Sequence, residues 1–215
     1  MQPRHKSKSD DRQIATALAV VQLPLPSPFS QTEGDGTSDA HSRFPVVVYS
    51  IGHSNHDAET FLALLNQHEV RTVIDVRSAP FSRYVPHFNR RNLARLVERA
   101  AMHYVWLGNL LGGRPEDPEC YGADGALDAA YVASRPWHQD GIARVLASAA
   151  ANPTVILCSE ENPRRCHRHR LLEPSLGKLG AIVLHIRHDG TLEKLSPASE
   201  HVALAEQLVL AGIAQ

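Results

Sequence analysis

Two cysteines and a histidine near residue 160 are the side chains best suited to covalent chemistry. Cys158 ends an apolar run, and Cys166 and His167 follow shortly before Leu171. A thiolate is a strong nucleophile, and a nearby imidazole can take or give a proton. His167 shares a helical stripe with the apolar Leu171, so we expect it to face inward, with its helical neighbour Arg168 turned elsewhere. We predict Cys158 as the nucleophile and His167 as its proton carrier or thiolate partner.

Imidazole and guanidinium groups follow the other predicted strands. His53 comes after the first, Arg77 after the second, and Arg114 after a Gly-Gly pair. A guanidinium binds carboxylates and phosphates through parallel N–H bonds. Arg77 either pairs with the nearby Asp75 or reaches a ligand, and we favour the ligand. We predict substrate-binding roles for His53, Arg77, Arg114 and Arg168.

The same residues support an alternative function, metal binding. Cys158, Cys166 and His167, with His53 as a further ligand, offer the thiolates and imidazoles that zinc and iron prefer. The gap between the cysteines, residues 159–165, is not the spacing of a zinc knuckle. Our leading prediction therefore includes no metal and no cofactor.

A further alternative is a non-catalytic module that binds a nucleotide or nucleic acid. Its candidate residues are Arg77, Arg83, Arg90, Arg91, Arg164 and Arg168. The chain has 22 Lys and Arg against 23 Asp and Glu, a net charge of -1. Proteins that bind duplex DNA through phosphate charge are usually far more basic, so nucleic acid is the less favoured partner.

Composition places the chain among globular proteins. It has 215 residues, 43% of them hydrophobic and 21% charged, which suffices for one domain with a core. No apolar run approaches the ~18 residues of a membrane helix, so no membrane contact is expected. The odd number of cysteines and the lack of a C-x-x-C pair indicate thiols in a reducing cytoplasm. No dinucleotide, P-loop, zincin or α/β-hydrolase motif is present.

Short β-branched runs alternate with helical patterns from residue 45 on. Strands are predicted over 46–51, 70–76, 104–107, 154–158 and 181–186. Helices are predicted after Asn55 or Asp57, after Asn89, over 126–134 and 139–150, and from Pro163, with a long loop over 108–125. This order predicts an α/β fold, a three-layer sandwich with a mostly parallel central sheet of about five strands. Ligands of such sheets bind beyond the carboxyl ends of the strands, where the candidate residues lie.

The two ends of the chain receive different predictions. Residues 1–44 are rich in Pro, Ser, Gly and charged residues and are expected to form a flexible tail. The apolar patch 14–21 follows Asp10 and Asp11 and is short for a signal peptide. Residues 45–215 are predicted to form a single α/β domain that ends with a helix over 199–213.

Several motifs together resemble a known family. They are Ile51-Gly-His-Ser54, Asp75-Val-Arg77 followed by Pro80, Leu111-Gly-Gly-Arg114, and Cys158-x-Glu160-x-x-Pro163-x-x-Cys166-His167-Arg168. In this order they resemble the domain-of-unknown-function family 488, from about Tyr49 to about Gly190. This family has no assigned activity, and the segment before residue 45 is not part of its pattern.

A weaker likeness, at the level of the fold, is to rhodanese-type domains. These also have Asp-x-Arg at one strand end and a cysteine at the end of a later strand, facing a helix N-terminus. The likeness implies a rhodanese-like or flavodoxin-like variant of the fold. The sequence departs from rhodaneses at Glu160 and Glu161, whose carboxylates disfavour a thiolate on Cys158. A helix N-terminus and the basic residues Arg164, Arg165 and His167 favour one.

These observations lead to one main hypothesis. We predict a cytoplasmic enzyme, a Cys-dependent transferase or hydrolase, that acts on a small anionic or phosphorylated substrate. The hypothesis requires Cys158, His167 and Arg77 to share one cavity at the carboxyl edge of the sheet.

Overall fold

The computed structural model describes residues 45–195, which belong to the compact unit His41–Gln215. The predicted tail over 1–44 and the predicted terminal helix over 199–213 lie outside these residues. The domain boundary at residue 45 therefore stays a prediction. No helix within 45–195 has the length and apolar character that crossing a membrane would need.

Runs of β-branched and aliphatic residues form the strands, as their packing preference predicts. The strands are β1 (Val47–Gly52), β2 (Thr72–Asp75), β3 (His103–Trp106), β4 (Thr154–Cys158), β5 (Ile182–Ile186) and β6 (Leu192–Glu193). Every residue of β2 and β4 is buried. These strands are therefore covered on both faces, as in other parallel sheets.

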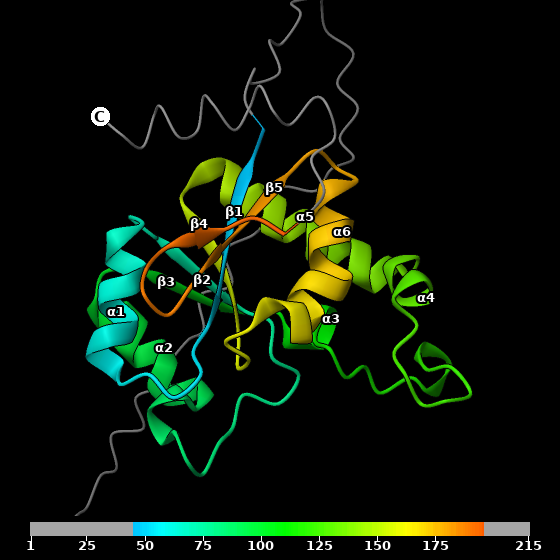
Figure 1. Ribbon diagram of the computed structural model, residues 1–215, viewed down its shortest axis with the longest axis horizontal. Coiled ribbons are helices and arrows are strands. Elements are labelled where there is room, and N and C mark those ends of the chain that lie inside the picture. Colours follow the sequence, from blue (N-terminus) through cyan, green and yellow to red (C-terminus); the bar gives the residue numbers. More distant parts are fainter. Residues whose placement is uncertain (1–44, 196–215) are drawn as a thin grey trace, which may run out of the picture. The chain divides into compact units, whose positions relative to one another are not determined.

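The strands form one sheet in the order β3-β2-β4-β1-β5-β6 (Figure 1). All neighbours are parallel except β5 and β6, which are antiparallel. The α/β class and the mostly parallel sheet are thus confirmed, with 6 strands instead of about five. The extra strand β6 has only 2 residues, too few to give a recognisable pattern, and follows a turn with Gly190 at φ 83°. The rhodanese-like or flavodoxin-like variant stays a prediction.

Helices cover both faces of the sheet. They are α1 (Ala58–Gln67), α2 (Arg90–Arg99), α3 (Gly108–Leu111), α4 (Ala129–Ala133), α5 (Pro136–Ala151) and α6 (Glu173–Gly177). In Figure 1, α1 and α2 lie on one side of the strands, and α3, α5 and α6 on the other. The described residues therefore form three layers, and an apolar cluster fills each of the two spaces between them.

Alternation along the strands decides which layer each side chain enters, because successive residues point to opposite faces. Ile156 and Cys158 of β4 belong to the cluster that contains Ile142 of α5. Val155 and Leu157 belong to the opposite cluster, with α1 and α2. The carboxyl edge of the sheet thus has two separate faces.

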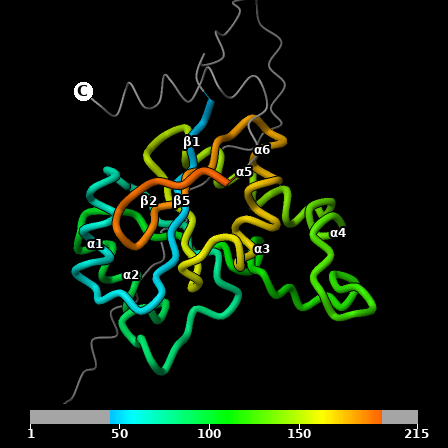
Figure 2. Tube along the Cα trace, viewed as in Figure 1, coloured from blue at the N-terminus to red at the C-terminus, as the bar shows by residue number. Residues whose placement is uncertain are grey.

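The strand order brings the ends of β1, β2 and β4 together. β4 lies between the other two, and Gly52 of β1 pairs in register with Cys158 of β4. The pairing continues past the strands, since the His53 N–H donates to the Cys158 carbonyl at 2.9 Å and the Val76 N–H donates to Leu157 at 3.0 Å. Figure 2 lets the reader follow these neighbouring segments along the chain. The reversal of strand order here makes this edge a ligand-binding position in open α/β sheets.

Candidate active site

Cys158 reaches the sheet edge as the last residue of β4. It lies in the same apolar cluster as Cys166. Beyond Cys158 the chain crosses the end of β1 so closely that a Cβ on Gly52 would overlap the carbonyl group of Glu160. A glycine is needed at position 52 because only a residue without a side chain permits this approach.

The segment after Pro163 is not the continuous helix that the sequence predicts. A 3₁₀ turn, η3 (Pro163–Arg165), comes first, with the Asn162 side chain accepting from the Arg164 N–H at 3.0 Å. Cys166 is then extended, with φ −112° and ψ 152°. A Pro at the first position and an Asn cap are compatible with a short turn as well as with a helix.

A π-helical turn, η4 (Arg168–Leu172), follows Cys166 and leads into α6. Because Cys166 is extended, regular helical geometry does not apply to the residues around it. His167 and Arg168 both contact the cysteine cluster, so the expectation that only one of them faces inward is wrong.

The ring of His167 turns one nitrogen, Nδ1, toward both cysteine sulfurs. Its Nδ1 is 3.6 Å from Sγ of Cys166 and 3.8 Å from Sγ of Cys158. Its Nε2 is buried and has no hydrogen-bond partner among the described residues. Buried N–H groups rarely lack a partner, and of the two ring nitrogens only Nδ1 has one. We therefore assign the proton to Nδ1, which donates toward the sulfurs.

Arg168 is fully buried and holds the cluster against the sheet. Its Nε donates to Sγ of Cys166 at 3.3 Å, and its Nη1 donates to Oγ of Ser50 at 2.9 Å. Its Nη2 donates to the backbone carbonyls of Glu160 and Glu161. The fork of the guanidinium is thus occupied by the protein itself, and the substrate-binding role of Arg168 stays a prediction.

The pKa values of the two cysteines are shifted in opposite directions. A hydrogen bond from the Cys158 thiol lowers the pKa of Cys166 to about 3, helped by His167 and Arg168 and opposed by burial. The same hydrogen bond and burial raise the pKa of Cys158 well above its usual value. The physical reason is that the cation and the imidazole N–H lie closer to Cys166. These opposite shifts favour the thiolate form at Cys166 and the protonated form at Cys158.

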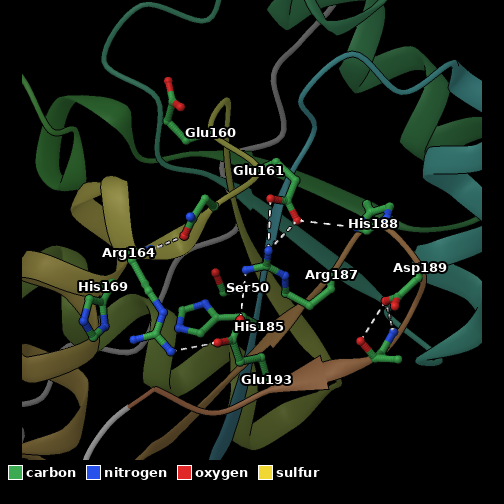
Figure 3. A network of polar contacts seen from close by, with 12 residues as sticks. Ser50, Glu160, Glu161, Arg164, His169, His185, Arg187, His188, Asp189 and Glu193 are labelled. Atoms are coloured by element: carbon green, nitrogen blue, oxygen red, sulfur yellow. Dashed lines mark hydrogen bonds and ion pairs between the residues drawn. The ribbon is translucent and has the colours of Figure 1, made fainter.

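The carboxylates near Cys158 do not face the sulfurs. Oε2 of Glu161 accepts from Nη2 of Arg187 at 3.1 Å, and Nη1 of Arg187 donates to Glu193 at 2.9 Å (Figure 3). Arg164 joins the same network by donating to Glu193 at 2.9 Å. Glu160 is exposed, and Figure 3 shows its side chain pointing away from this network. The network ties the loop after β4 to the β5–β6 hairpin and pairs the Glu161 carboxylate with Arg187.

Arg77 and His53 form a second polar cluster, centred on Asp75. The Asp75 carboxylate accepts from Nε and Nη2 of Arg77 at 2.8 and 2.6 Å, and from the Tyr104 hydroxyl at 2.7 Å. Nη1 of Arg77 lies 3.0 Å from Nε2 of His53, whose Nδ1 lies 2.9 Å from the Ser54 carbonyl. Burial, and then Arg77, lower the pKa of His53 to about 4. The sequence analysis favoured a ligand over Asp75 as the partner of Arg77, whereas the structure pairs Arg77 with Asp75.

The two clusters lie on opposite faces of the sheet. His53 stacks on Phe88, with ring centroids 4.3 Å apart, in the layer of α1 and α2. Cys158 and His167 meet in the layer of α5 and α6. The structure thus brings together Cys158 and His167 but not Arg77 or His53. The substrate-binding roles of Arg77 and His53 stay predictions.

Arg114 lies in the loop that covers His167. A Cβ on Gly113 would be 2.8 Å from Cγ of the His167 ring, so the backbone of this loop rests directly on the imidazole. The Arg114 N–H donates to Oγ of Ser78 at 3.0 Å, which holds the loop in place. The Arg114 side chain is exposed, and its chain neighbour Gly113 contacts the His167 ring. Its role in substrate binding stays a prediction.

The sequence analysis overlooked two residues near the thiolate. Ser50 is a buried polar residue within an apolar strand, and it anchors Arg168. His138 of α5 is buried, and its pKa is lowered to about 4 by burial and by the charge of His167. A polar residue inside an otherwise apolar strand or helix face was the signal that could have identified both.

The six arginines proposed for nucleic-acid binding do not form one exposed set. Arg77 and Arg168 are buried and bound by protein groups. Arg90 lies over the Trp106 ring, 4.1 Å from its centroid. The nucleic-acid module stays a prediction without a common surface to support it.

Fold and site together define an α/β domain with a cysteine–imidazole pair at the edge of a mostly parallel sheet. The family model described as "Domain of unknown function DUF488" matches residues 57–174, more than half of the chain. The chain belongs to this family, which confirms the resemblance found in the sequence. Comparisons with curated proteins and with solved structures found no match.

Proposed function

We propose that this protein is an enzyme that uses the Cys166 thiolate as a nucleophile against a small anionic substrate. The observation that carries the proposal is the position of the Cys166 sulfur, 3.6 Å from His167 Nδ1 and 3.3 Å from Arg168 Nε. A thiolate beside an imidazole N–H is the arrangement of a nucleophile with its proton donor. His167 would protonate the leaving group while Cys166 forms a bond to the substrate.

The proposal transfers the nucleophile from Cys158, the residue favoured by the sequence, to Cys166. Nε of Arg168 donates to the Cys166 sulfur at 3.3 Å, whereas the Cys158 sulfur has Cys166, His167 Nδ1 at 3.8 Å and the Glu160 backbone as its polar neighbours. Cys158 keeps a role in this site, because its thiol donates a hydrogen bond to the thiolate. A nucleophile that is ionised at neutral pH needs no separate base to activate it.

The positively charged side chains around Cys166 and His167 favour an anionic substrate. Arg114 is exposed beside the loop that covers His167, and Arg165 is exposed beside Cys166. Arg168 adds a buried positive charge behind the sulfur. Guanidinium groups favour carboxylates and phosphates, so the class of substrate is a small carboxylate or phosphate ester.

Alkylation with a charged and a neutral reagent tests both parts of this proposal. Iodoacetate and iodoacetamide are applied to the native chain at pH 6, and the label is mapped by mass spectrometry. We expect Cys166 to react at least tenfold faster than free glutathione, with a larger advantage for the anionic reagent. Cys166→Ser abolishes the fast label, and Arg114→Ala reduces the preference for iodoacetate.

Cys120 provides the internal control, because it is fully buried in the same layer and has burial and Asp117 raising its pKa. Label on Cys120 at the rate of Cys166 would mean general unfolding. Label on Cys158 instead of Cys166 would restore the original nucleophile assignment, and no fast label on either would refute the proposal.

A second candidate function, metal binding, is favoured by one specific observation. The ligand atoms of Cys158, Cys166 and His167 lie within 4.8 Å of one another. For tetrahedral zinc, bond lengths of about 2.3 Å to sulfur and 2.0 Å to nitrogen separate the ligand atoms by about 3.5–3.8 Å. The sulfur–nitrogen distances of 3.6 and 3.8 Å are close to these values. Metal analysis of protein purified without a histidine tag tests it, and less than a tenth of an equivalent would exclude it.

A cytoplasmic location remains part of the proposal. Cys120, Cys158 and Cys166 are free thiols, and the nucleophile needs a reduced sulfur. A reducing compartment supplies this condition. Fractionation of cells that produce the protein at its natural level tests the location.

A further inference from the structure

A second cluster of metal-ligating side chains lies on the same face of the sheet as the cysteines. It consists of His169 on η4, Glu173 at the start of α6 and His185 on β5. Oε2 of Glu173 lies 2.6 Å from Nδ1 of His169 and 3.2 Å from Nε2 of His185. The ligand atoms all lie within 4.8 Å of one another. Neither the proposed nucleophile nor the second candidate function uses these residues.

Two of the three side chains in this cluster are buried, which raises the energetic cost of a charged carboxylate. Glu173 is 2% exposed and His185 is 0% exposed. A carboxylate removed from water is stable only close to positive charge or strong hydrogen-bond donors. Each imidazole can hydrogen-bond to the carboxylate, or turn a lone pair toward a cation that the carboxylate also binds. A divalent cation would bring positive charge to this buried carboxylate.

The backbone that presents two of these ligands is unusual. The Glu173 N–H bonds to the Arg168 carbonyl, which closes a π-helical turn with one more residue than an α-helical turn. Such turns are rare and occur frequently at functional sites. Here the turn lets adjacent residues serve different clusters, with Arg168 directed at Cys166 and His169 at Glu173.

The third ligand comes from the core of the sheet. His185 interrupts the apolar strand β5, where it pairs in register with Ser50 of β1. Figure 3 shows the rings of His169 and His185 beside each other, and their centroids are 6.5 Å apart. The His169 side chain is 31% exposed, which gives an ion a route from solvent to the buried ligands.

We propose that His169 Nδ1, Glu173 Oε2 and His185 Nε2 together bind one divalent transition-metal ion. Two imidazoles and one carboxylate form the ligand set of catalytic zinc sites and of non-haem iron sites, both of which keep positions open for water or substrate. On binding, each ligating nitrogen gives up any proton it carries, either to its other ring nitrogen or to solvent. The set contains no thiolate, so it selects zinc, iron or cobalt over soft metals.

Cobalt(II) is the probe that separates this site from the cysteines. It is titrated into the chelator-treated full chain that carries Cys158→Ser and Cys166→Ser. We expect one equivalent to bind, with visible d–d absorption and without the near-ultraviolet band of a thiolate–cobalt bond. Proton release at fixed pH accompanies binding. In the wild-type chain the same d–d absorption appears.

Ligand variants in the same Cys158→Ser, Cys166→Ser background complete the test. His169→Ala and Glu173→Gln each raise the Kd for cobalt at least tenfold. His188→Ala removes a histidine that is 69% exposed and outside the cluster, so it leaves the Kd unchanged. Circular dichroism establishes that each variant is folded, and His169→Ala replaces the most exposed of the three ligands.

The proposal is overturned if the thiol-free chain binds no cobalt at ten times the protein concentration. It is also overturned if His169→Ala binds as tightly as His188→Ala. If the double serine variant does not fold, the wild-type spectrum decides: a thiolate–cobalt band would put the ion on the cysteines. None of these results bears on the alkylation of Cys166, so the nucleophile and the metal site stand or fall separately.

Discussion

The Nε–H of Arg168 donates to the sulfur of Cys166 at 3.3 Å, while the Nη1–H of the same guanidinium donates to Oγ of Ser50 on the central strand β1 at 2.9 Å. One buried side chain therefore links the proposed nucleophile to the middle of the sheet. The hydrogen bond from Arg168 both positions the Cys166 sulfur and favours its ionisation. A change that displaces Arg168 should therefore affect the structure of the loop after β4 and the reactivity of Cys166 together.

Replacement of Arg168 tests this link. Arg168→Met leaves the thiolate and two carbonyl groups without their donor, so we expect a loss of about 3–5 kcal/mol in the free energy of unfolding. Arg168→Lys keeps the charge but not the planar fork, and it should cost less than Arg168→Met. Urea denaturation measures both. A loss below about 1 kcal/mol in Arg168→Met would contradict the central role of this residue.

Gly113→Ala tests the packing of the covering loop on His167. The new Cβ would lie 2.8 Å from the ring, so either the loop or the imidazole must move. We expect a loss of about 1–3 kcal/mol in stability and slower alkylation of Cys166. Gly177→Ala is the matched control, since nothing lies within 4 Å of its Cβ. Equal effects of the two substitutions would contradict the close contact.

Asp75→Asn tests the second polar cluster. It leaves the buried Arg77 guanidinium without its anion, and we expect a loss of about 3–5 kcal/mol in the free energy of unfolding. Tyr104→Phe removes one hydrogen bond to the same carboxylate and should cost about 1–2 kcal/mol. The double variant Asp75→Asn, Arg77→Met should lose less than the two single variants added together. Strict additivity would show that the pair does not act as a unit.

Buried imidazoles make stability depend on pH. Burial and Arg77 lower the pKa of His53 from 6.5 to about 4, and burial and His167 lower the pKa of His138 to about 4. Between pH 4 and pH 6.5 these two imidazoles therefore bind more protons in the unfolded chain than in the folded one. Stability should therefore fall as the pH drops from 6.5 to 4, by up to about 1.4 kcal/mol per pH unit for each imidazole.

His53→Asn isolates one of these two contributions, because its amide oxygen can still accept from Arg77. We expect the slope of unfolding free energy against pH to decrease by up to about 1.4 kcal/mol per pH unit between pH 6.5 and 4. Chemical denaturation at a series of pH values measures the slope. An unchanged slope would mean that His53 is not held neutral by the fold.

Local signals in the sequence located the strands and most of the helices. The runs that form β1, β2, β4 and β5 are apolar and β-branched, so their identity depends on side-chain type alone. Strand β6 and the π-helical turn at Arg168–Leu172 were not foreseen. Both are short and depend on hydrogen bonds to segments elsewhere in the chain.

In the candidate site, too, the local sequence predicted some features and contacts between distant segments determined others. The motif around Cys158 placed a cysteine at a strand end and a second cysteine and a histidine after it, and these three side chains do meet. The motif could not show that Cys166 is extended and therefore receives Arg168 as well as His167. A regular helix was expected there, and Cys158 was preferred as the nucleophile because it lies at a strand end, where ligands of such sheets bind.

By itself the sequence determined the α/β class, the family and the set of polar residues at the carboxyl edge, because these follow from side-chain types and their order. Only the tertiary structure determined on which face of the sheet each of those residues lies. Alternation along β2 and β4, together with the strand order, sends Asp75 and Arg77 to one face and Cys158 to the other. The tertiary structure also brought His169 and Glu173 close to His185, and no local sequence pattern links these residues. Which side chains share a face depends on contacts between distant segments, and no local pattern specifies those contacts.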